Sequence, residues 1–159
     1  QDLSMTETEI GVVMALNGVI ITVFEMILIH KLEGKRKALT YVIIGTLLTG
    51  IGFLVLNLIQ GMLFGLAVIF IILVTFGEII NMPFASTFWM NRSNSKNMGQ
   101  YAGVFTISWA VAQIAGPAIG GQIAQHWGYN TLWWVTGILC IATIAGYRWI
   151  KENPEVPEP

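Results

Sequence analysis

The chain has 159 residues, of which 55% are hydrophobic, and it carries only eight basic and nine acidic side chains. Soluble domains carry charge on about a quarter of their residues. A charged share of 11% is too small to cover the surface of a soluble domain. The composition therefore excludes disorder, nucleic-acid binding and an ordinary soluble enzyme, and it indicates a protein whose main surrounding is a lipid bilayer.

Long segments without charge define the expected membrane spans. No Asp, Glu, Lys or Arg occurs in 38–77 or in 97–147. A helix crosses the hydrocarbon core with about 20 apolar residues, whereas barrel strands would show alternating segments of about ten. We therefore expect an all-α polytopic membrane protein, with a transmembrane bundle over 1–150 and a disordered cytoplasmic tail at 151–159. The five expected helices cover about 9–30, 38–58, 61–88, 98–124 and 130–150.

The basic residues predict the orientation of this bundle. They lie in the first loop, in the third loop and at the end of the last span, and the second and fourth loops contain no Lys or Arg. Because short cytoplasmic loops carry an excess of Lys and Arg, we expect the C-terminus in the cytoplasm and the N-terminus outside. The expected location is a bacterial inner membrane.

The fourth span contains a pattern of small residues around a proline. Small residues at such spacing let neighbouring membrane helices approach closely, and a membrane helix tolerates proline when its neighbours satisfy the freed carbonyl. Simple helix packing is one reading of this pattern. The residues of the pattern are Gly103, Ala112, Gly116, Pro117, Gly120 and Gly121.

The spacing as a whole resembles the motif G-x8-G-x3-G-P-x2-G-G of major facilitator superfamily transporters of the drug:proton antiporter type, with Ala112 in place of the second glycine. The stretch 34–37 is similar to the end of that family's loop motif. A basic cytoplasmic loop that follows the positive-inside rule would explain these residues equally well. The stretch 76–84 is similar to a Gly-Glu…Pro segment of the family. The order matches helices eight to twelve of twelve, so the resemblance implies a C-terminal fragment whose partner is a missing N-terminal half.

The resemblance implies secondary active transport of a small, drug-like molecule by alternating access. The proton gradient would supply the energy, and no cofactor is expected. The sequence shows no catalytic or metal-binding constellation, so neither an enzyme nor a metal site is expected. Two alternatives stay open: uptake of a sugar, peptide or organic anion by the same fold, and a five-helix membrane subunit that scaffolds a partner and transports nothing.

Two carboxylates fall inside the expected spans, and both are candidates for proton coupling. A charge at bilayer depth costs at least about 2.5–3.5 kcal/mol, so such residues usually face protein or water. Because burial disfavours the charged form of a carboxyl group, Glu78 is expected to bind and release a proton during transport. Glu25 is the second candidate, but pairing with Lys31 or Lys35 would give it a structural role instead.

Four further side chains are expected in a substrate cavity. The resemblance places Asn17 and Asn81 on helices that flank or line the cavity. Trp109 and Gln113 form an i, i+4 pair on the fourth span, where an aromatic face and an amide are suited to an aromatic or cationic substrate. Packing within the bundle would explain this pair equally well.

Overall fold

A computed structural model describes residues 7–58 and 63–150, and the expected tail at 151–159 lies outside the described residues. Within the described part the chain forms four helices: α1 (Glu7–Leu32), α2 (Ala38–Leu58), α3 (Leu63–Met90) and α4 (Met98–Trp149). Each contains a segment long and apolar enough to cross a membrane. The expectation of an all-α membrane protein is therefore confirmed.

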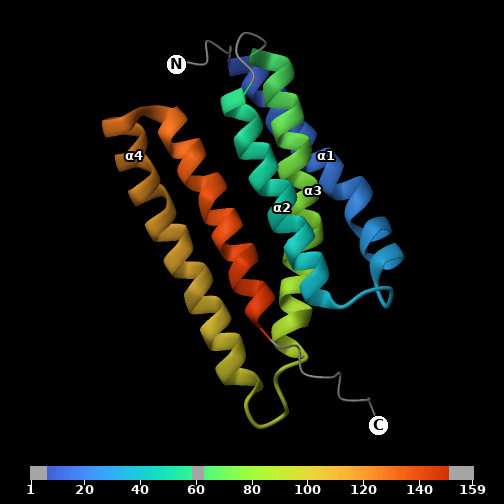
Figure 1. Cartoon of the computed structure of the whole chain (residues 1–159). Coiled ribbons are helices and arrows are strands. Elements are labelled where there is room, and N and C mark those ends of the chain that lie inside the picture. The colour runs from blue at the N-terminus through green and yellow to red at the C-terminus, as the bar shows by residue number, and fades with distance from the viewer. Residues whose placement is uncertain (1–6, 59–62, 151–159) are drawn as a thin grey trace.

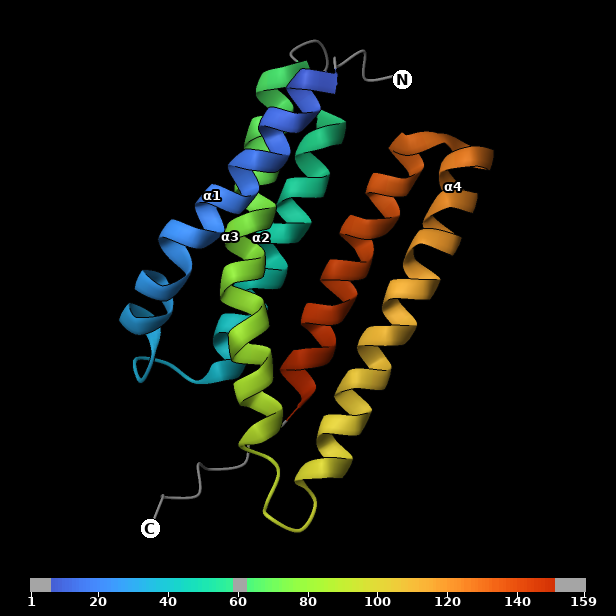
Figure 2. The same cartoon turned by 180° about the vertical axis from the view of Figure 1, so that it is seen from behind.

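The helical elements number four and not the expected five in the described part, because the last two expected spans are joined without a loop into the 52-residue element α4, in which two helices meet at the non-helical Gly128. The chain reverses at one residue, Gly128, where φ is 82° and ψ is 165°. Only glycine adopts such backbone angles without strain. Figures 1 and 2 show the resulting hairpin, in which the arm before Gly128 and the arm after it run antiparallel. The reversal thus falls inside the break expected at 125–130, but it needs no loop.

The helices pack in the spatial order α1, α3, α2, α4. Helix α3 contacts α1 and α2, and α2 in turn contacts α4, mainly through the arm after Gly128 (Figure 2). The buried cluster at one end of the bundle joins Tyr41 and Val42 of α2 to Phe84 of α3, with Tyr147 of α4 against it. The rings of Tyr41 and Phe84 lie 4.3 Å apart, centroid to centroid.

Helices α2 and α3 approach each other most closely at two glycines. A methyl group on Gly45 would lie 2.6 Å from the carbonyl oxygen of Gly77, and one on Gly77 would lie 2.5 Å from Oγ1 of Thr49. No side chain larger than hydrogen fits at either position without moving the helices apart. The close approach of two backbones through small residues is the usual packing device of membrane helices, where burial of apolar side chains from water supplies no driving force.

The two short connections lie at the same end of the bundle as the end of α4, and the reversal at Gly128 lies at the opposite end (Figure 1). At the first connection, Gly34 has a φ of 72° and ends α1 in the left-handed conformation common after helices. At the second, Asn94 and Asn97 each accept a backbone N–H of the turn through their side-chain oxygens. Tight turns thus hold the basic residues of both connections at one end.

Candidate functional site

Helices α1 and α3 are joined by a polar contact in the interior of the bundle. Asn17 donates from Nδ2 to Oγ1 of Thr75 at 3.0 Å, and that hydroxyl donates to the carbonyl oxygen of Ile71 at 2.5 Å. The side chain of Thr75 is completely buried. A buried hydroxyl without a partner costs free energy, so the contact both satisfies Thr75 and fixes α1 on α3. Asn17, expected in the substrate cavity, here holds two helices together.

Asn81 makes the corresponding contact between α3 and α2. Its Nδ2 donates to Oγ1 of Thr46 at 2.9 Å and to the carbonyl oxygen of Val42 at 3.2 Å. These bonds lie about one helical turn from the close approach of Gly45 and Gly77, so the same stretch of α3 supplies both backbone contact and hydrogen bonds. The amide hydrogens of Asn81, also expected to face substrate, are used between helices.

Glu78 lies on α3 between these two contacts and is half-buried. Within the described residues no hydrogen bond or ion pair joins its carboxylate to another group. Eleven residues separate it from Trp89, which on an α-helix brings two positions to within about 20° of the same direction. The ring of Trp89 lies 5.8 Å from that of Phe105 on α4. Glu78 therefore lies on the side of α3 that is directed towards the first arm of α4.

The first arm of α4, from Met98 to Trp127, has two different sides. Phe105 contacts α3, and Trp109 follows it by four residues, within about 40° of the same direction. Gln113 follows one turn later, near the level of Asn81 and Glu78 when both helices are counted from the contact between Trp89 and Phe105. Both Trp109 and Gln113 are exposed. On an ideal helix Trp109 thus lies near the Phe105 side of α4 and Gln113 about 80° from it, and no contact among the described residues joins either side chain to Glu78.

The opposite side of this arm is aliphatic and exposed. It includes Ile114, which is 75% exposed, and Ile107, which is 65% exposed. In the membrane such a side is suited to lipid or to apolar helices. The arm therefore exposes an aliphatic surface on the side opposite Phe105.

Glu25 lies on α1 and is half-buried. Its neighbour Phe24 contacts Phe76 of α3, with ring centroids 5.8 Å apart. Within the described residues Glu25 forms no ion pair with Lys31 or Lys35, the partners that a structural role would use. The structure does not join Glu25 to Glu78.

The small residues of the α4 pattern make few close contacts with other helices among the described residues. Around Gly103, Gly116 and Gly121 nothing described lies within 4 Å of an added methyl group, and at Gly120 a methyl would meet Leu132 of the second arm at 3.5 Å. The glycines in close contact are others, among them Gly45, Gly77 and Gly137. The spacing of Gly45 and Thr49, four residues apart on one span, is the signal that could have indicated the α2–α3 contact.

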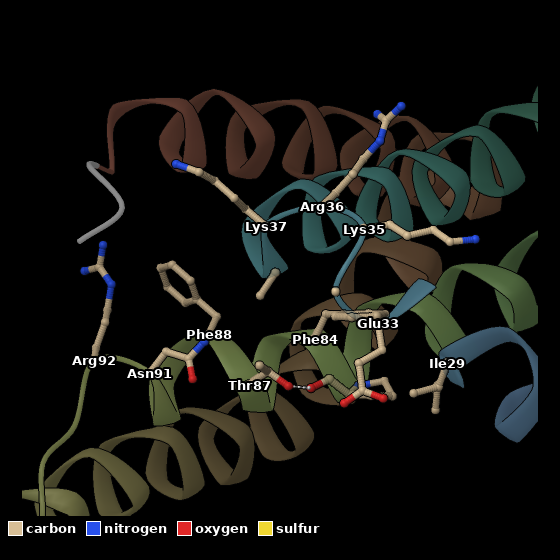
Figure 3. A pocket seen from close by; sticks show the side chains of 13 residues that line it. Ile29, Glu33, Lys35, Arg36, Lys37, Phe84, Thr87, Phe88, Asn91 and Arg92 are labelled. Atoms are coloured by element: carbon tan, nitrogen blue, oxygen red, sulfur yellow. Dashed lines mark hydrogen bonds between the residues drawn. The ribbon is translucent and has the colours of Figure 1, made fainter. Parts of the chain in front are cut away.

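A pocket of about 610 Å³ lies between the α1–α2 connection and the end of α3 (Figure 3). Four basic residues line the pocket, together with the acidic residue Glu33. The guanidinium carbon of Arg92 lies 4.6 Å from the centre of the Phe88 ring, as in a cation–π contact. The basic residues can be located in the sequence, but the pocket cannot. The four are Lys35, Arg36, Lys37 and Arg92.

These features define a polytopic helical membrane protein that keeps polar and ionisable groups between its helices. The model of the Major Facilitator Superfamily matches residues 1–159, so the chain belongs to this family of membrane transporters. The comparisons with curated proteins and with solved structures gave no match.

Proposed function

We propose that the chain forms part of a proton-coupled secondary transporter that moves a small, drug-like molecule by alternating access, with Glu78 as the proton-carrying group. Membership of the transporter family supports the general function. Substrate would bind near the middle of the membrane, between this part and an N-terminal half, as in other transporters built from repeated helical units. Export in exchange for protons is the direction that the resemblance to antiporters favours.

The observation that carries the proposal is a half-buried carboxylate with no partner among the described residues. An ionised carboxylate at bilayer depth is costly unless it faces water, a cation or a proton donor. No other acidic or basic residue occurs on α3. A group in this position can alternate between a protonated state and an ionised state that pairs with a cationic substrate, which is the exchange that antiport requires.

Trp109 and Gln113 are proposed to contact the substrate. The ring of Trp109 is 49% exposed, so it offers an aromatic face to an aromatic or cationic molecule. The amide of Gln113 makes no hydrogen bond within the described residues and can pair with polar groups of that molecule. Asn17 and Asn81 lie in the same part of the bundle, where their hydrogen bonds hold α1 and α2 against α3, the helix that carries Glu78.

The test is the variant Glu78→Gln in the full-length transporter, reconstituted into vesicles with an imposed pH gradient. Glutamine keeps the size and polarity of the side chain but cannot release a proton. We expect accumulation of substrate driven by the gradient to be lost, while exchange of labelled for unlabelled substrate at equal pH continues.

The matched control is Glu7→Gln, which makes the same replacement in the first turn of α1, where an acidic residue stabilises the helix end. Wild-type coupling is expected in this variant. Gradient-driven accumulation that persists at the wild-type level in Glu78→Gln would remove Glu78 from the mechanism.

A further inference from the structure

We propose that the pocket between the α1–α2 connection and the end of α3 binds the phosphate group of an anionic phospholipid. This site is separate from proton coupling, because it lies at the end of the bundle and not on the helix sides that carry Glu78 and Trp109. Leu32 ends α1, Ala38 begins α2 and Met90 ends α3. The pocket therefore lies where the apolar helices stop, at the level of lipid headgroups.

The charge of the pocket favours an anion. Among the described residues, Lys35, Arg36, Lys37 and Arg92 line it together with one acidic residue, Glu33, and Figure 3 shows the charged ends of the four basic side chains spread around its rim. The first residue of α2 also lines the pocket, so the positive end of that helix dipole adds to the field. Basic pockets between membrane helices are known recognition sites for phosphate-bearing lipid headgroups.

The walls of the pocket favour a lipid over a free phosphate ion. Ile29, Pro83, Phe84 and Phe88 form an apolar lining beside the basic groups. A free phosphate ion would gain nothing from these side chains, whereas the glycerol and first acyl carbons of a phospholipid would be removed from water against them. The volume of about 610 Å³ lies within the range of sites for small molecules, roughly 300–1,000 Å³.

A basic loop also serves to orient the protein in the membrane, and the experiment has to separate that role from binding. Lys96 provides the comparison. It belongs to the α3–α4 connection at the same end of the bundle and is exposed, but it does not line the pocket. Replacing it removes one positive charge from the same side of the membrane and leaves the pocket intact.

The experiment titrates the purified full-length transporter, in a neutral detergent, with short-chain phosphatidylglycerol, short-chain phosphatidylcholine or inorganic phosphate. Bound lipid is counted by native mass spectrometry. We expect phosphatidylglycerol to bind in preference to phosphatidylcholine. Each basic group near a lipid phosphate contributes about fivefold in affinity, so the variant Lys35→Gln/Arg36→Gln should bind phosphatidylglycerol about 25-fold more weakly. Lys96→Gln should stay within twofold of the wild type.

The variant Glu33→Gln gives a test in the opposite direction. Removing the acidic group of Glu33 should tighten binding of phosphatidylglycerol about fivefold, because a like charge next to the phosphate is lost. A misfolded protein cannot produce such a gain. Equal weakening by Lys96→Gln, or equal binding of the two lipids, would overturn the proposal. Inorganic phosphate that binds as tightly as phosphatidylglycerol would reassign the pocket to the free ion and overturn the lipid assignment.

Discussion

At the scale of single residues, the amides of the first and third helices act as links between helices. Asn17 reaches the completely buried Thr75 on α3, and Asn81 reaches Thr46 and the backbone of Val42 on α2. Polar side chains on membrane helices are candidates for substrate contact, and their composition alone does not distinguish that role from interhelical bonding. Only the rotation of each helix about its axis decides which role a given amide has.

The contact between Asn17 and Thr75 predicts energetic coupling. In a double-mutant cycle of Asn17→Leu and Thr75→Val in the full-length transporter, we expect a coupling of about 0.6 kcal/mol, with about 1.7 kcal/mol as the upper bound for such bonds. The measurement is the free energy of unfolding in bicelles. Thr143→Val is the control, because Thr143 is exposed and its hydroxyl bonds only to Leu139 of its own helix. Additive effects of the two substitutions would contradict the contact.

At the scale of helices, the contact of α2 with α3 depends on glycine more than on large side chains. Gly45 and Gly77 leave room for backbone against backbone, and Asn81 then lies close enough to α2 to bond with it. The same stretch of α3 carries Glu78 and Pro83. A change in the spacing of α2 and α3 would therefore also displace the carboxylate that we propose for proton coupling.

The glycine contact predicts a strong effect of Gly77→Leu. The added side chain would force α2 and α3 apart, and overpacking of this kind costs about 1–3 kcal/mol or more. We expect a lower melting temperature and loss of transport. Gly146→Leu is the matched control, because an added methyl group at Gly146 meets nothing described within 4 Å. Equal destabilisation by the two variants would show that helix propensity, and not the close approach, limits glycine replacement.

The sequence predicts the helices well and their contacts poorly. The charge-free runs place α2 at 38–58, as the structure has it, because the need to cross about 30 Å of hydrocarbon fixes length and composition. The sequence predicts a loop at 125–130, because the single Gly128 is a weak signal among five polar or aromatic residues. The contacts of Gly77 and Thr75 depend on how helices rotate against each other, and nearly uniform apolar helices carry little information on rotation.

At the scale of the whole molecule, the distribution of charge distinguishes the two ends. The connections at 33–37 and 91–97 and the end of α4 lie together and contain Lys or Arg. The reversal at 125–130 lies at the other end and contains neither. The basic pocket lies at the charged end as well. Topology and the proposed lipid site therefore draw on the same group of side chains.

This distribution predicts that the charged end faces the cytoplasm, because Lys and Arg in short loops are retained there. Single cysteines placed at Ser95 and at Gln125, both exposed positions, report on the two ends in a background with Cys140→Ala. A membrane-impermeant thiol reagent should label Gln125→Cys in intact cells, and Ser95→Cys only after the membrane is opened. The reverse pattern would invert the topology. It would also place the basic pocket in the outer leaflet, where any anionic lipid that it binds would have to be found.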